Sequence, residues 1–190
     1  MAGTLNVAVI CGSLRRRSYN AALARSLPAF APAGTKLAAG PPIDVIPHYN
    51  ADVQSSAGFP ASVNAFADAV RAADGVVIVS PEYNWSIPGV LKNAIDWVSR
   101  MKDQPFANKP VALQSCATGP LGGSRMQYHL RQSLTSIDAF LFGRPEVLVT
   151  FAPQKFDEKT LVLMDAPTID IVKQQLVAFE AFIRRVAAGK

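Results

Sequence analysis

Hydroxyl and guanidinium side chains gather in one short loop near the N-terminus. Ser13 and Ser18 enclose three consecutive arginines, Arg15–Arg17. The buried apolar run Leu5–Cys11 precedes this loop, and apolar residues spaced as on one face of a helix follow it from Tyr19. The first backbone N–H groups of a helix lack internal acceptors and carry partial positive charge, so anions bind there. The sequence therefore predicts a phosphate site in this loop.

Two further loops carry unusual residues, and each follows an apolar run. Pro81–Trp85 comes directly after Gly75–Ser80 and offers two flat aromatic side chains beside an asparagine. Ala117–Gly123 comes directly after Val111–Cys116 and contains three glycines, which allow backbone to approach a ligand closely. Together with the arginine loop, these loops predict a site for a flat, phosphorylated ring system.

Strand-like and helix-like stretches alternate along the chain. Besides the three apolar runs above, we expect a fifth strand at Glu146–Phe151 and a weak strand near Lys36–Ala39. Pro41–Ser56 is expected to be a long loop. The expected helices run from Tyr19 onward, from Pro60 to about Ala73, from Ser86 as N-cap to about Met101, from the glycine loop to about Ser136, and from about Thr168 to Val186.

This alternation predicts one α/β domain over residues 1–190. Five strands alternating with helices imply a mainly parallel sheet that is covered on both faces. Ligands of such sheets bind beyond the C-terminal ends of the strands, where the strand order reverses. Since all three unusual loops follow a strand, we expect them to meet at that edge.

Composition argues against several other classes of function. The net charge is +5 and the pI about 9.4, but outside the arginine loop the basic residues are scattered, which disfavours nucleic-acid binding. No apolar run approaches the roughly 20 residues that span a membrane, and the N-terminus lacks the layout of a signal peptide. Cys11 and Cys116 are expected to be free thiols of a cytoplasmic protein. The two cysteines and two histidines lack metal-ligand spacing, so no metal site is expected.

Two longer segments carry a family resemblance. GSLRRRSYN and PEYNWSIPGVLKNAIDW resemble the signature segments of the NAD(P)H-dependent FMN reductase family, and the similarity extends through GPLGGSRMQYHLRQ. Within that family the chain is most similar to the bacterial chromate and quinone reductases. The resemblance implies a flavodoxin-like three-layer sandwich with strand order 2-1-3-4-5 and bound FMN. It also implies NADPH or NADH as donor, quinones or chromate as acceptors, ping-pong kinetics, and a homodimer or homotetramer.

The same resemblance assigns residues to the cofactor. It places Ser13, Arg15, Ser18 and Asn20 on the FMN phosphate, Tyr19 beside them, Pro81, Glu82, Tyr83 and Asn84 against the isoalloxazine chiefly through backbone, and Ser115 with Gly119 along its other edge. It supplies no catalytic side chain, because the flavin itself carries the chemistry. Trp85 stands where many relatives have another residue type, at the expected substrate rim.

Several other residues have two readings each. His48 and Tyr49 cover the flavin rim or make a subunit contact, and Tyr83 and Trp85 contact the ring or cap the sheet edge. Arg125, Tyr128, His129 and Arg131 are expected on a solvated helix face, and the resemblance gives Arg125, Tyr128 and Glu146 an oligomer interface as a second reading. Val90, Leu91 and Trp97 form an interface or belong to the core.

Two rival functions remain from the sequence. Cys11 to Ser18 also fits C-x5-R-S, the anion loop of low-molecular-weight tyrosine phosphatases, with Cys11 as nucleophile and Arg17 as phosphate clamp. That chemistry needs an Asp-Pro acid, and the sequence contains no such dipeptide. The other rival is a flavodoxin-type electron carrier, although such carriers are commonly acidic and this chain carries +5.

Overall fold

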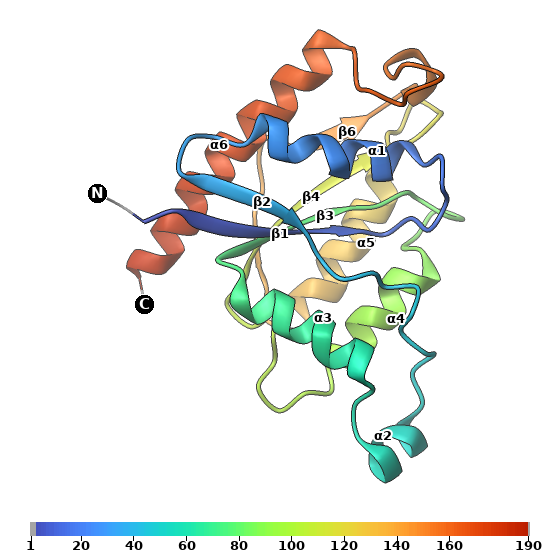
Figure 1. Ribbon diagram of the computed structural model, residues 1–190, viewed down its shortest axis with the longest axis vertical. Coiled ribbons are helices and arrows are strands. Elements are labelled where there is room, and N and C mark those ends of the chain that lie inside the picture. The colour runs from blue at the N-terminus through green and yellow to red at the C-terminus, as the bar shows by residue number, and fades with distance from the viewer. Residues whose placement is uncertain (1–2, 190) are drawn as a thin grey trace.

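The strands form one sheet in which every paired strand is parallel to its neighbour (Figure 1). The computed structural model describes residues 3–189. The strands are β1 (Leu5–Cys11), β2 (Thr35–Ala39), β3 (Gly75–Val79), β4 (Pro110–Cys116), β5 (Phe140–Leu141) and β6 (Val147–Val149). The helices are α1 (Tyr19–Ser26), α2 (Ala51–Ala57), α3 (Ala61–Ala72), α4 (Gly89–Val98), α5 (Ser124–Thr135) and α6 (Ala166–Ala188), with short 3-10 turns η1 (Leu27–Phe30) and η2 (Ala152–Gln154).

The strand order is β2-β1-β3-β4, and the fifth position is shared by two short strands. β5 pairs with Pro110 and Val111 at the start of β4, while β6 pairs with Gln114–Cys116 at its end. The order 2-1-3-4-5 with helices on both faces confirms the flavodoxin-like fold that the resemblance implied. The predicted fifth strand is therefore shorter than expected, and β5 was not foreseen because two residues show no periodicity.

Alternation along the strands divides the core into two layers. In β1, Ala8 and Ile10 pack with residues of α3, α4 and α5, whereas Val7 and Val9 pack with residues of α1 and α6. Figure 1 shows α1 and α6 on one side of the sheet and α3 and α4 on the other. All five residues of β3 are buried, as a central parallel strand requires. Each such buried aliphatic side chain contributes about 1.5–3 kcal/mol to the stability of the fold.

Gly12 allows the ends of two neighbouring strands to approach closely. Its N–H donates to the Val79 carbonyl at 2.9 Å, and a Cβ at this position would lie 2.3 Å from Ser80 Oγ. Any larger residue would push the arginine loop away from the end of β3. This close approach explains why a glycine stands between β1 and the polar loop.

Three boundaries differ from the sequence expectation. The expected loop Pro41–Ser56 contains most of α2, which Asn50 caps by accepting from Asp52 N–H at 2.8 Å. No residue of α2 is buried, so it carried no apolar pattern. Ser86 is not an N-cap: α4 begins at Gly89, because Ser86 is held by Tyr83 in a tight turn. The last helix begins at Ala166, two residues before Thr168.

Candidate functional site

The N-terminus of α1 is arranged to receive an anion. Ser18 caps the helix, its Oγ accepting from Ala21 N–H at 3.3 Å. Tyr19 and Asn20 are the first two residues of the helix, and within residues 3–189 their N–H groups have no acceptor. The Arg15 guanidinium is exposed and forms no ion pair with any described residue. These groups together make a positive cradle.

The cradle opens into a hollow of about 300 Å³ at the C-terminal edge of the sheet. Its lining comes from the loops that follow β1, β3 and β4, as the sequence predicted. The lining residues are Ser13, Arg15, Ser18, Tyr19, Asn20, Pro81, Glu82, Tyr83, Cys116, Ala117 and Thr118. We call this hollow the loop cavity. It brings together eight of the residues that the resemblance assigned to the cofactor, and leaves out Asn84, Ser115 and Gly119.

Asn20 lines the loop cavity, but its side-chain amide is already used. Both of its polar atoms bond to the backbone of Cys116 at the end of β4. The residue can therefore offer only its backbone N–H to an anion. Its side chain instead fixes the distance between the arginine loop and the loop that follows β4.

Arg17 points away from the loop cavity. Its guanidinium donates to the carbonyl oxygens of Glu158 and Lys159, which ties the arginine loop to the segment before α6. Cys11 does not line the cavity either, and desolvation by burial raises the pKa of its thiol. A phosphatase needs a thiolate and a free arginine clamp at one anion site, so this geometry disfavours that reading.

The loop after β3 folds into a tight two-residue hairpin. Tyr83 and Ser86 exchange two backbone hydrogen bonds of 3.1 and 3.0 Å, and Asn84 and Trp85 between them have φ of 47° and 67°. Two left-handed central residues are the mark of a type I′ turn. The turn leaves the Glu82 and Asn84 N–H groups without an acceptor among residues 3–189. It also exposes the tip, where 66% of Trp85 is accessible.

The Glu82 carboxylate caps a helix that has no cap of its own. α5 starts after Gly123, which has a left-handed backbone and, as a glycine, no side chain that could cap the helix. Glu82 Oε2 accepts from Met126 N–H at 3.2 Å, and its Oε1 lies 3.5 Å from Arg125 Nη1. Negative charge at a helix N-terminus is stabilising. The Glu82 carboxylate therefore faces α5, and only the Glu82 backbone is available to a ligand in the loop cavity.

Two more contacts hold the hairpin against α5. The Arg125 guanidinium carbon lies 4.1 Å from the ring centre of Trp85. Ser86 Oγ and His129 Nδ1 are 2.9 Å apart, within hydrogen-bonding distance. Exposed cation–π contacts of this kind contribute about 0.5–1 kcal/mol. The hairpin is therefore anchored along two turns of one helix.

Ser115 is buried beneath the loop that follows β4. Its Oγ donates to the Gly122 carbonyl at 2.5 Å and accepts from Gln127 Nε2 at 2.8 Å. A Cβ on Gly123 would lie 2.8 Å from that Oγ, so the packing leaves no room for a larger residue. Ser115 shapes this loop from below and does not line the cavity.

The sequence reasoning placed Ala117 and Thr118 in a predicted ligand loop, but it assigned neither of them, nor Cys116, to the cofactor. Cys116, Ala117 and Thr118 stand directly at the C-terminal end of β4. The end of a buried strand was the available signal for Cys116. The N–H groups of Thr118 and Gly119 have no acceptor within residues 3–189, so this wall also presents backbone donors.

His48 and Tyr49 lie away from the loop cavity. Tyr49 packs edge-on against Trp97 with ring centres 5.0 Å apart, and its N–H donates to Asn93 Oδ1 at 2.8 Å. Neither residue lines the cavity. Trp97 and Leu91 are fully buried within the chain, so of their two readings the core is the one observed.

Metal and membrane features are not found in the described structure. Among residues 3–189, no three His, Cys, Asp or Glu side chains are grouped so that they could hold a metal ion. In the same range, no helix has the length and apolar character to cross a membrane.

The chain matches known proteins along nearly its whole length. Residues 5–154 match the family model described as NADPH-dependent FMN reductase. A quinone reductase of Escherichia coli (strain K12) is 50% identical over 186 residues, which cover 98% of this chain and 99% of that protein. An NAD(P)H-dependent FMN reductase of Pseudomonas aeruginosa is 41% identical over 186 residues, with 98% and 99% covered. The solved flavoenzyme NAD(P)H:acceptor oxidoreductase of Paracoccus denitrificans superposes with a TM-score of 0.85 at 30% identity, covering 96% and 98%.

Proposed function

The chain belongs to the NADPH-dependent FMN reductase family, and from this membership we propose that it oxidises NADPH or NADH through FMN in the loop cavity and reduces quinones. One observation carries the proposal. The unpaired Arg15, the open N-terminus of α1 and two loops with free N–H groups all meet at one hollow. The net charge of +5 favours an enzyme that binds the anions FMN and NADPH over an acidic, flavodoxin-type carrier.

The donors of the loop cavity fit the two ends of FMN. We propose that Arg15, the hydroxyls of Ser13 and Ser18, and the N–H groups at the start of α1 hold the phosphate. Such charge-assisted bonds are about twice as strong as neutral ones. On this proposal, Tyr83 and the Cys116–Thr118 wall border the ring system.

When bound, FMN accepts hydride and returns electrons, which is chemistry that no side chain here can perform. The protein places and polarises the ring. Backbone N–H groups of Glu82 and Thr118 would stabilise negative charge on its edge, because fixed dipoles need no reorganisation during the reaction. Glu82 brings no unpaired negative charge to the ring, since its carboxylate is bonded to Met126 and Arg125.

The finer parts of the proposal concern order, acceptor and assembly. We propose that the nucleotide and the acceptor occupy the same open side of the cavity in turn, which gives ping-pong kinetics. Chromate is proposed as a second acceptor, since a small dianion is drawn to a basic protein. A homodimer or homotetramer in the cytoplasm is proposed as well, in keeping with the unpaired thiols Cys11 and Cys116.

The test starts from the visible spectrum of the purified protein. Two flavin bands that bleach on anaerobic addition of NADPH, and return on addition of benzoquinone, are expected. Initial rates at several fixed quinone concentrations should give parallel double-reciprocal lines, and the same assay with chromate tests the second acceptor. A protein that binds no added FMN would refute the main proposal. Intersecting lines would refute only the ping-pong order.

A further inference from the structure

A second hollow, of about 510 Å³, lies beside the loop cavity. It is bounded by α1, by the end of β1 and by residues 39–44 after β2. Ser13 belongs to the lining of both hollows, so they meet at the arginine loop. We call it the α1 hollow. Its volume lies in the range of about 300–1,000 Å³ that is usual for small-molecule sites.

The α1 hollow has mostly apolar walls and two charged groups. Small or rigid side chains such as Ala24, Pro28 and Pro41 form most of its surface, as in a slot for an aromatic ring. Arg25 and Asp44 line it from opposite elements. Within residues 3–189 neither forms an ion pair, so both charges are available to a ligand.

We propose that the α1 hollow binds the adenosine phosphate half of NADPH. Adenine would lie in the apolar slot, with Asp44 accepting from its amino group or from a ribose hydroxyl. Arg25 would pair with the 2′-phosphate, which NADH lacks. The inference rests on the proposed function, and it supplies the determinant of NADPH preference that the sequence did not reveal.

The α1 hollow lies where the outer half of a bound NADPH would reach. With FMN filling the loop cavity, of about 300 Å³, the adenosine half of the dinucleotide has to bind outside it. The rest of the dinucleotide must leave that cavity across one of its walls. At Ser13 the wall is shared with a recess that carries an unpaired arginine, and arginine is well suited to binding phosphate.

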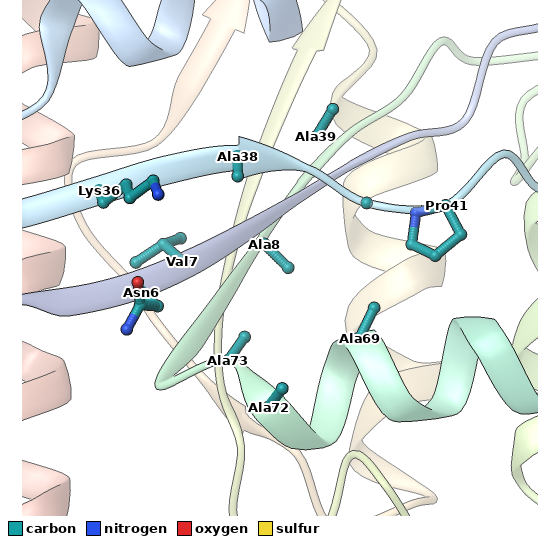
Figure 2. Close-up of a pocket in the computed structure, with 11 residues that line it drawn as sticks. Asn6, Val7, Ala8, Lys36, Ala38, Ala39, Pro41, Ala69, Ala72 and Ala73 are labelled. Atoms are coloured by element: carbon teal, nitrogen blue, oxygen red, sulfur yellow. The ribbon is translucent and has the colours of Figure 1, made fainter.

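Two other hollows lack this combination. The hollow of about 460 Å³ between β1, β2 and α3 adjoins the α1 hollow through residues 39–41, but Figure 2 shows it walled by alanines, with Lys36 as its one charged lining residue. The hollow between α4 and α5 contains Lys92, whose charge is paired with Asp96 at 2.6 Å. Neither shares a residue with the loop cavity.

Kinetics of the FMN-loaded enzyme test the inference. Arg25→Gln should raise the KM for NADPH roughly tenfold, as the loss of one phosphate contact predicts. The KM for NADH, the kcat and the flavin spectrum should stay within about twofold of the wild type. Asp44→Asn should raise the KM for both nucleotides. Lys36→Gln removes the same charge from the neighbouring hollow and should change neither KM.

A second measurement needs no variant. 2′,5′-ADP should inhibit the wild-type holoenzyme competitively against NADPH, and Arg25→Gln should weaken that inhibition. An unchanged KM for NADPH in a flavin-loaded Arg25→Gln enzyme, or no inhibition of the wild type by 2′,5′-ADP, would overturn the inference while leaving the proposed function intact. A wild-type protein that retains no FMN or oxidises no NADPH refutes the proposed function itself.

Discussion

The side-chain amide of Asn20 forms two hydrogen bonds with the backbone of Cys116. Its Nδ2 donates to the Cys116 carbonyl at 2.9 Å, and its Oδ1 accepts from the Cys116 N–H at 2.8 Å. Asn20 is 4% exposed, so water does not compete for either bond. The pair joins the first turn of α1 to the end of β4 and thereby sets the width of the loop cavity.

Replacing Asn20 should cost both stability and cofactor affinity. Asn20→Ala leaves a buried N–H and a buried carbonyl of Cys116 without partners, and we expect a loss of about 2–4 kcal/mol in urea unfolding. FMN binding, followed by flavin fluorescence, should weaken as well. Asn64→Ala is the control, because that exposed amide makes a single bond to Phe59 and its removal should cost under about 1 kcal/mol. Equal losses of stability in the two variants would show that the hydrogen bonds between Asn20 and Cys116 contribute nothing special.

The three arginines of the loop should differ in their effects. Arg15→Ala removes an unpaired charge from the loop cavity, so the Kd for FMN should rise about 10- to 100-fold without a change in the urea midpoint. Arg17→Ala should lower the midpoint instead, because Arg17 bonds to Glu158 and Lys159. Arg16→Ala removes an equal charge outside the cavity and serves as control. An FMN affinity that fell equally in Arg15→Ala and Arg16→Ala would show that only net charge matters.

Removal of the Glu82 carboxylate should loosen α5. Glu82→Ala deletes both the bond to Met126 N–H and the pairing with Arg125, and a lost cap costs about 1 kcal/mol. Glu82→Gln keeps an acceptor for the N–H and should recover about half of that loss. Hydrogen exchange at the first turn of α5 measures the effect locally. Protection that is unchanged in Glu82→Ala would show that the cap contributes nothing.

Replacing Trp85 should change the free energy of unfolding very little. A left-handed backbone costs a non-glycine residue about 1–2 kcal/mol, and the stack on Arg125 returns about 0.5–1 kcal/mol. Trp85→Gly should therefore leave the free energy of unfolding within about 1 kcal/mol of the wild type. The KM for quinone should change while FMN is retained. A loss above about 2 kcal/mol would mean that the tryptophan packs as part of the fold.

Acid should weaken the N-cap of α6, which is Asp165, whose carboxylate accepts from Thr168 N–H at 3.0 Å. The Thr168 hydroxyl, then its N–H and the charge of Lys155, hold the pKa of Asp165 below its ordinary value against a smaller opposing effect of burial. A lowered pKa in the folded state means that the stabilisation is full above about pH 4 and is lost as the pH falls through the folded pKa. Asp165→Asn should thus be less stable than the wild type at pH 7, with the difference shrinking by pH 3. A stability difference between Asp165→Asn and the wild type that stays constant from pH 7 to pH 3 would show that the charge of the carboxylate does not support the cap.

The sequence by itself determined most of the elements and the order of the loops. Buried apolar runs such as Gly75–Ser80 and the spacing of apolar residues by three and four in the helices are local patterns. They were sufficient to predict a parallel sheet and the set of loops that meet at its C-terminal edge. The family resemblance then named the cofactor and most of the residues that line the loop cavity.

Tertiary structure decided where each side chain points. Asn20 turns from the anion to Cys116, which lies 96 residues away, and Glu82 turns from the ring to Met126, 44 residues away. Ser115 turns inward, and α2 forms with no buried residue. Local propensity does not encode such choices. A buried polar group bonds to whichever partner the packed fold brings within reach, because leaving it unsatisfied costs about 1–3 kcal/mol.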